Sequence, residues 1–155
     1  MKILAISDIH GEENENLYKY LENNDIDLVI ILGDITNFGP LEFVGEFIGK
    51  IFDYDCDVIA IPGNCDPTGI CKAIGESGAF CLHNEIIGYG DAILFGYGGS
   101  NPTPFDTPGE IEDLKIYGDV FDALREGKNI DISLFGEKYS PSELGYIVSL
   151  QSSVK

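Results

Sequence analysis

Short apolar runs alternate with amphipathic stretches through the first half of the chain. The segments 2–7, 27–32 and 57–62 each contain a short apolar run with the length and the β-branched content of a buried strand. The stretches between them, Glu13 to Asn24 and Leu41 to Phe52, repeat their apolar residues at helical spacing. The order strand, helix, strand, helix, strand predicts an α/β fold built on a parallel sheet with right-handed crossovers.

The pattern changes after Pro67. A short helix over about 68–76 is predicted first. Short apolar segments then follow at 79–82, 85–88 and 92–96, and tight polar turns separate them. Such spacing is typical of β-hairpins.

The last third of the chain carries weaker signals. A loop rich in glycine and proline covers 96–108, a helix is predicted over about 110–126, and 130–135 is a candidate strand. The tail from 136 shows no recognisable motif. Because no repeat, linker or compositional break divides the chain, we expect a single domain over 1–155.

Composition indicates an ordinary globular protein. The hydrophobic fraction is 44% and the charged fraction 23%, both close to the average for soluble domains. The first apolar run meets the polar pair Ser7-Asp8 at once, unlike a signal peptide. No apolar run approaches the roughly 20 residues that span a bilayer. These features predict a cytoplasmic protein without a membrane partner.

Net charge and cysteine content further limit the binding partners, disulfides and metal sites that the sequence is compatible with. The formal net charge is -18, and no cluster of basic residues offers a surface for phosphate backbones. Stable binding to a nucleic-acid duplex is therefore not expected, whereas a small phosphate ester held through a metal remains compatible with this charge. The four cysteines lack CxxC spacing, which favours free thiols over a disulfide framework or a four-thiolate zinc site.

Residues of metal-ligand type follow each of the first three predicted strands. Asp8 and His10 follow the first strand, Asp34 the second and Asn64 the third. Because ligands of open parallel sheets bind beyond the carboxyl ends of the strands, these side chains are expected in one crevice. Each short motif alone is more often a turn or a helix cap, so the prediction depends on all three occurring in order.

These residue types suit a hydrolytic metal site. Carboxylate, imidazole and amide oxygen together match Mn²⁺, Fe or Zn better than calcium. A carboxylate such as Asp34 can bridge two ions roughly 3.5–4 Å apart, and such a pair activates water and neutralises phosphate charge. Asp8 and His10 would then share one ion, and Asn64 would bind the other.

The segments DIHG, GDITNFGP and PGNCDP resemble the first three motifs of the calcineurin-like metallophosphoesterase superfamily, especially its small prokaryotic members. The resemblance covers about 2–126, and the segment 127–155 diverges. The resemblance implies two packed mixed β-sheets flanked by helices, an αββα sandwich. It also implies divalent metal, Mn²⁺ foremost with Fe, Zn or Ni as alternatives, held by Asp8, His10, Asp34 and Asn64. Asp66 would close the third motif and orient its neighbour.

Two departures from the superfamily pattern stand out. Cys65 occupies a position where many members carry a histidine beside the leaving group, so Cys65 is expected either as a weak hydrogen-bond donor there or as a packing residue. The later histidine motifs of the superfamily are missing. The remaining histidine, His83, is predicted to be a solvated turn residue. A truncated or frame-shifted gene product and a genuinely short variant both account for the missing motifs.

The resemblance implies a phosphoesterase that uses metal-activated water on phosphate mono- or diesters, with Cys65 and Asp66 beside the leaving group. Ser100 and Asn101, in the loop over 96–108, are candidate substrate contacts, although a rigid turn fixed by prolines is the favoured explanation of that loop. The alternative is a catalytically impaired scaffold of the same fold. A flavodoxin-like binding module explains the strand rhythm but not the ligand types that end each strand.

Overall fold

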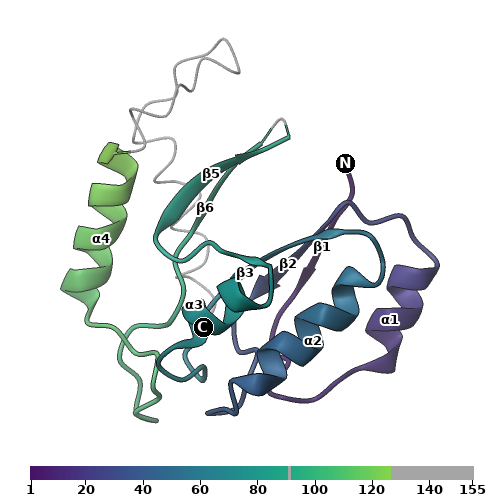
Figure 1. Ribbon diagram of the computed structural model, residues 1–155. Coiled ribbons are helices and arrows are strands. Elements are labelled where there is room, and N and C mark those ends of the chain that lie inside the picture. Colours follow the sequence, from purple (N-terminus) through teal and green to yellow (C-terminus); the bar gives the residue numbers. More distant parts are fainter. Residues whose placement is uncertain (91, 127–155) are drawn as a thin grey trace.

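The computed structural model describes residues 1–90 and 92–126, so the predicted strand at 130–135 and the tail from 136 lie outside the described residues. Within these described residues, six strands and four helices follow the predicted order. Figure 1 shows their arrangement. The strands are β1 (Ile3–Ile6), β2 (Leu28–Leu32), β3 (Asp57–Ile61), β4 (Phe80–Cys81), β5 (Glu85–Tyr89) and β6 (Ala92–Gly96). The helices are α1 (Glu15–Glu22), α2 (Glu42–Phe52), α3 (Ile70–Glu76) and α4 (Asp113–Glu126).

The first four strands form one parallel sheet in the order β1-β2-β3-β4. Sequential order with right-handed crossovers places α1, α2 and α3 on the same face of this sheet. The other face is covered by the antiparallel hairpin of β5 and β6 (Figure 1). The predicted parallel sheet, packed sheets and flanking helices are therefore confirmed.

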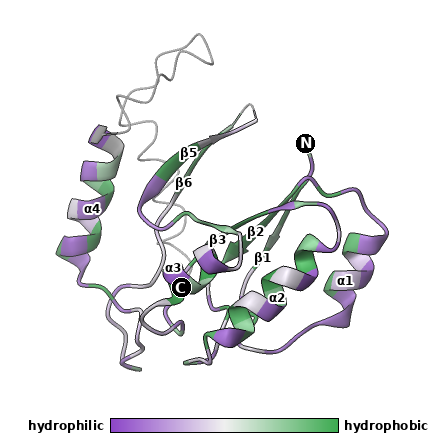
Figure 2. Ribbon diagram, in the orientation of Figure 1, coloured by the Kyte–Doolittle hydropathy of each residue, from purple (hydrophilic) through white to green (hydrophobic). Residues whose placement is uncertain are grey.

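Side chains that alternate between the two faces of the sheet pack into two hydrophobic clusters among the described residues. In β3, Val58 and Ala60 pack with the helices, whereas Ile59 and Ile61 pack towards the hairpin with Leu28 of β2. Because both faces of β2 and β3 are covered, these two strands appear in the sequence as unbroken apolar runs. Strand β1, at the edge of the sheet, differs from the buried strand that its apolar run predicted, because exposed residues alternate along it with partly buried ones. Figure 2 shows hydrophobic colour on visible parts of the strands of the parallel sheet.

One strand differs from the sequence prediction. The segment at 79–82 was expected to belong to a hairpin, but β4 pairs in parallel with β3, through Ile59 with Phe80 and Ala60 with Cys81. Helix α3 supplies the crossover that a parallel neighbour requires. The hairpin prediction holds only for β5 and β6.

Local hydrogen bonds adjust two helix boundaries. The Asn14 side chain accepts from the backbone N–H of Asn16, which caps α1 and starts it at Glu15 rather than at Glu13. Helix α4 starts at Asp113 rather than near Glu110, because the Glu110 carboxylate binds Thr103 and Thr107 in the preceding loop. No helix among the described residues is both long enough and apolar enough to cross a membrane.

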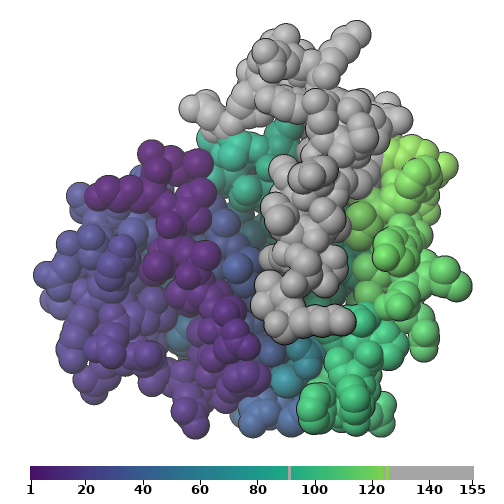
Figure 3. Space-filling model, turned by 180° about the vertical axis from the view of Figure 1, so that it is seen from behind, coloured from purple at the N-terminus to yellow at the C-terminus, as the bar shows by residue number. Residues whose placement is uncertain are grey.

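Figure 3 views the molecule from behind. The purple amino-terminal residues and the green residues of α4 lie at opposite sides of this face.

Candidate metal centre

The loops that follow β1, β2 and β3 meet at the carboxyl edge of the parallel sheet. Backbone hydrogen bonds join the first two loops, from the N–H of His10 to the carbonyl of Asp34 at 2.8 Å and from Gly11 to Ile35 at 2.9 Å. The third loop joins the second through the N–H of Cys65, which donates to Asp34 Oδ1 at 2.8 Å. The convergence predicted from strand order is therefore present in the structure.

Backbone conformation in these loops is unusual. Asp8, His10 and Asp34 all have left-handed backbones, with φ of 57°, 51° and 51°. Non-glycine residues seldom adopt this region, and such conformations concentrate at functional sites. The left-handed turns redirect the chain directly after β1 and β2, which places these side chains at the sheet edge.

Close backbone approach explains one glycine of the third motif. A Cβ on Gly63 would lie 2.0 Å from Asp34 Oδ1 and 2.1 Å from the Asp34 backbone nitrogen. Only a residue without a side chain lets the loop after β3 approach Asp34 this closely.

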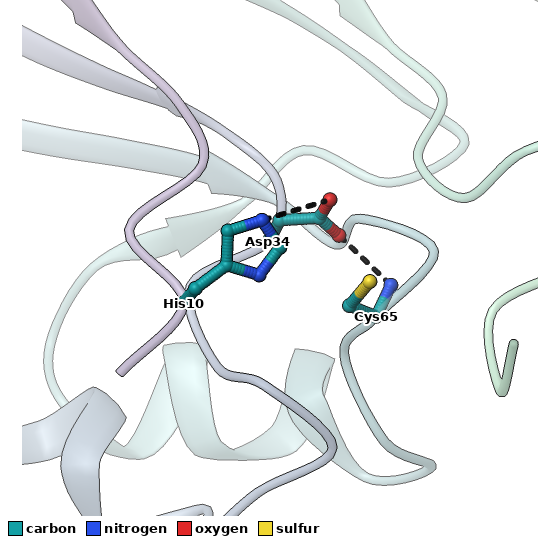
Figure 4. Close-up of side chains that lie close together, drawn as sticks. All are labelled: His10, Asp34 and Cys65. Atoms are coloured by element: carbon teal, nitrogen blue, oxygen red, sulfur yellow. Dashed lines mark hydrogen bonds and ion pairs between the residues drawn. The ribbon is translucent and has the colours of Figure 1, made fainter. Parts of the chain in front are cut away.

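Three ligand-type side chains converge in the space between the loops. One ligand atom from each of His10, Asp34 and Cys65 lies within 4.8 Å of the other two (Figure 4). His10 Nε2 lies 3.9 Å from Asp34 Oδ2, while Asp34 Oδ1 holds the Cys65 backbone. The two oxygens of Asp34 therefore have different partners, one towards the cluster and one towards the supporting loop.

The other two predicted ligands border this cluster. Asp8 Oδ1 lies 3.8 Å from His10 Nε2, and Asp8 is the more exposed of the pair. The side-chain nitrogen of Asn64 lies 3.5 Å from Cys65 Sγ and 3.2 Å from Thr107 Oγ1. The assignment of Asp8 and Asn64 as metal ligands remains a prediction.

Asp66 is a buried residue whose carboxylate joins two of the loops of the site. Its side chain is 2% exposed, and its carboxylate accepts hydrogen bonds from the N–H groups of Ile35, Thr36 and Gly63 and from the Thr36 hydroxyl. A buried carboxylate so fully hydrogen-bonded ties the loop after β2 to the loop after β3. The predicted role of Asp66 in orienting its neighbour and its predicted position beside the leaving group both remain predictions.

Electrostatics at the cluster favour a cation. Burial raises the pKa of the Asp34 carboxyl, and the charges of Asp66 and Asp8 add to the rise. Burial, followed by the charges of Asp34 and Asp66, likewise raises the pKa of the Cys65 thiol. A bound divalent cation would oppose both effects.

The glycine- and proline-rich loop packs against the third motif. Gly99 donates to the carbonyl of Pro62 at 2.9 Å, and Gly109 donates to the carbonyl of Asn64 at 2.8 Å. The hydroxyl of Thr107 contacts Asn64, and no sequence pattern in the loop had indicated this residue. The Thr103 hydroxyl, with further bonds from the same loop, lowers the pKa of the Glu110 carboxyl to about 2.

The two candidate substrate contacts lie at the start of this loop. Ser100 Oγ donates to the carbonyl of Asn101 at 3.0 Å, and the Ser100 backbone bonds to Gly109 and Ile111. Asn101 is exposed. Their role towards a substrate stays a prediction.

His83 is not the solvated turn residue that the sequence suggested. It is half-buried, its ring lies 4.9 Å from that of Tyr97, and its Nδ1 accepts from the N–H of Gly98 at 2.9 Å. Burial, followed by the charge of Lys115, lowers the pKa of the imidazole. The loop after β6 covers the turn, and this long-range packing has no local sequence signal.

The donor set fits a divalent metal. Imidazole nitrogen, carboxylate oxygen and thiol sulfur are common ligands of transition metals and zinc, and here they converge without any rearrangement of the backbone. Fold and site together define an α/β protein with a candidate metal centre at the carboxyl edge of a parallel sheet. The chain belongs to the calcineurin-like phosphoesterase family, which it matches over residues 1–150.

The chain is also similar to individual proteins. The chain is 33% identical over 132 residues to the uncharacterised protein MJ1162 of Methanocaldococcus jannaschii, covering 84% of this chain and 58% of that protein. The crystal structure of TT1561 from Thermus thermophilus is similar in fold, with a TM-score of 0.64 and 15% identity, covering 82% of this chain and 63% of the other. A further crystal structure gives a TM-score of 0.66 at 15% identity, covering 80% and 63%.

The chain spans less than two thirds of the length of each of these relatives. The family match reaches residue 150, beyond the 2–126 in which the motifs were recognised.

Proposed function

We propose that this chain hydrolyses phosphate mono- or diesters in a metal-dependent reaction that uses an activated water. The observation that supports this most is the convergence of His10, Asp34 and Cys65 at the carboxyl edge of the sheet in a calcineurin-like phosphoesterase. Three neighbouring strands contribute one side chain each. That is the arrangement expected of a site built for a ligand rather than of incidental surface polarity.

The residues divide into holding and supporting roles. His10 and Asp34 would hold the metal, with Asp8 and Asn64 at its flanks, and Mn²⁺ is the ion that the superfamily resemblance suggests. A bound divalent ion supplies positive charge against the phosphate and activates water for in-line attack on phosphorus.

Supporting residues keep this geometry in place. Asp66 fixes the two loops against each other through its buried hydrogen bonds. Ser100 and Asn101 would contact the substrate at the rim of the site. Cys65 has two available roles, as a hydrogen-bond donor to the leaving group and as a metal ligand.

Hydrolysis of p-nitrophenyl phosphate and bis-p-nitrophenyl phosphate with added divalent metal tests the proposal. We expect metal-dependent release of nitrophenol, and we expect Asp34→Asn to lower kcat/KM by at least about 100-fold, or about 2.7 kcal/mol of transition-state stabilisation. The substitution keeps the shape of the side chain and removes the charge that faces His10.

Asp55→Asn is the matched control. Asp55 also has a left-handed backbone, with φ of 55°, but it is exposed and precedes β3 at the opposite end of the sheet. We expect it to leave the rate unchanged. Equal activity of Asp34→Asn and the wild-type chain would contradict the proposal.

A scaffold role is the second candidate, and one surface favours it. Leu114, Tyr117 and Phe121 of α4 are 87%, 75% and 67% exposed, and their spacing places them along one side of the helix. Exposed apolar residues in a stripe are typical of protein contacts. Folded protein that binds no metal and shows no hydrolysis would favour this role over the enzymatic one.

A further inference from the structure

The arrangement around Cys65 bears on which metal the site takes. We propose that His10, Asp34 and Cys65 bind one zinc ion, with the Cys65 sulfur as a direct ligand. This refines the metal site on which the proposed hydrolysis rests. Metal binding can nevertheless be measured without any substrate.

The distances suit a mononuclear site. In a tetrahedral zinc site with metal–ligand distances of about 2.0–2.3 Å, neighbouring donor atoms lie about 3.5 Å apart. The donor atoms of the three side chains already lie within 4.8 Å of one another. Side-chain rotation alone can close the remaining gap, because backbone hydrogen bonds already hold all three loops.

The Asp34 carboxylate is oriented for this role. Its Oδ1 accepts from the Cys65 backbone N–H at 2.8 Å, and its Oδ2 is left facing His10 Nε2 at 3.9 Å. The same side chain therefore fixes the cysteine's backbone and offers a free oxygen to the ion. Partners that orient a ligand in this way are typical of metal sites.

The Cys65 sulfur also has a supporting donor. The side-chain nitrogen of Asn64 lies 3.5 Å from Sγ, and its second contact is the Thr107 hydroxyl at 3.2 Å. An N–H directed at sulfur stabilises a thiolate and so favours sulfur as a ligand. The alternative role, donation from the thiol to a leaving group, makes no use of this contact.

The mixed donor set selects the metal. One imidazole, one thiolate and one carboxylate form a soft-to-borderline set that suits zinc, whereas Mn²⁺ prefers oxygen ligands. Three protein ligands leave a fourth position open, as in catalytic zinc sites. Among the described residues, this is the one group of at least three histidine, cysteine or acidic side chains that converges in this way.

Cobalt substitution tests the sulfur ligand directly. Metal-free protein, kept reduced, is titrated with Co²⁺ and then with Zn²⁺ while the absorption spectrum is recorded. We expect a thiolate-to-cobalt charge-transfer band in the near ultraviolet, tetrahedral cobalt bands in the visible, and loss of both when one equivalent of Zn²⁺ is added. An equal concentration of Mn²⁺ should not displace the cobalt.

Cys65→Ser is the decisive variant. We expect it to lose the charge-transfer band and to weaken zinc binding by more than about 100-fold, since even supporting partners of a ligand contribute 10–100-fold. Circular dichroism shows whether the variant is folded. Cys71→Ser is the matched control, because Cys71 is a free, partly buried thiol on α3 and should leave the band intact.

Several outcomes would overturn the inference. The wild-type protein could show no charge-transfer band, or folded Cys65→Ser could bind zinc with unchanged affinity. Alternatively, the band could be lost in Cys71→Ser and kept in Cys65→Ser. Each can occur while Mn²⁺-dependent hydrolysis persists, in which case the proposed function stands without the zinc site. Conversely, zinc bound through Cys65 without any hydrolysis would support the inference and contradict the proposed function.

Discussion

Single atoms decide how closely the loops of the metal centre approach one another. Gly63 lies against Asp34 with no room for a side chain, whereas a Cβ on Gly49 in α2 would have no atom within 4 Å apart from its chain neighbours and its own helix backbone. The two glycines therefore serve different purposes, and the same substitution should have opposite effects at them.

Gly63→Ala should destabilise the protein by about 3 kcal/mol, because its Cβ would overlap Asp34 and push the loops apart. Gly49→Ala should stabilise it by about 1 kcal/mol, because alanine loses less conformational entropy in a helix. Urea unfolding of both variants beside the wild-type chain measures the difference. A Gly63→Ala protein as stable as the wild type would show that the close approach is not required.

Residue types at the strand ends could be predicted from the sequence, but their individual contacts could not. Strand order was enough to bring His10 and Asp34 together. The sequence held no signal that the oxygens of Asp34 would have separate partners, or that Cys65 Sγ would face the cluster, since both depend on how the loops turn.

At the scale of elements, a histidine links the turn after β4 to the loop after β6. Gly98 donates to His83 Nδ1, so the neutral imidazole is the form that accepts this bond. Burial lowers the pKa of His83 below its ordinary value of 6.5. Below that value the unfolded chain binds a proton more readily than the folded chain does. The stability that the neutral ring contributes is therefore complete above pH 6.5 and is lost as the pH falls through the folded-state pKa.

His83→Gln should remove this pH dependence. As the pH falls from about 7 to about 5, we expect the free energy of unfolding to decrease more in the wild-type chain than in the variant. Chemical denaturation at each pH measures it, and comparing the two proteins cancels the titration of all other groups. Parallel pH profiles would mean that His83 titrates alike in the folded and unfolded states.

The periodicity of the apolar residues predicted which segments form helices and which form strands, but it predicted less well how the strands pair. The long apolar runs of β2 and β3 indicated that both strands belong to a parallel sheet. The pairing of β4 could not be read, because two residues, Phe80 and Cys81, carry no periodicity of their own. Helix α4 began late because Glu110 is engaged by threonines of its own loop, and a helical pattern does not reveal such competition.

At the scale of the whole molecule, charge is the dominant long-range term. The chain carries 27 acidic and nine basic residues. The ion pairs Lys19–Glu15, Lys72–Glu76 and Arg125–Asp122 are all solvent-exposed. Exposed pairs contribute little, so repulsion among the excess carboxylates should outweigh them.

Added salt should therefore stabilise the protein. We expect Tm to rise between about 0.01 M and about 0.5 M sodium chloride, because the Debye length shrinks from about 30 Å to a few ångströms and screens the repulsion. Thermal unfolding followed by circular dichroism, with a chelator present to exclude metal effects, measures the change. A lower Tm at high salt would mean that the exposed pairs outweigh the repulsion.

The hydrogen bonds that join the three ligand-bearing loops have a consequence for the thermodynamics of ion capture. The backbones of His10, Asp34 and Cys65 are held to one another by partners that all lie within the first 66 residues. An arriving ion thus finds loops that are already ordered, and little conformational entropy remains to be lost on binding. Uptake of metal should resemble the filling of a rigid receptor, with a small change in heat capacity, rather than the coupled folding of a metal-dependent domain.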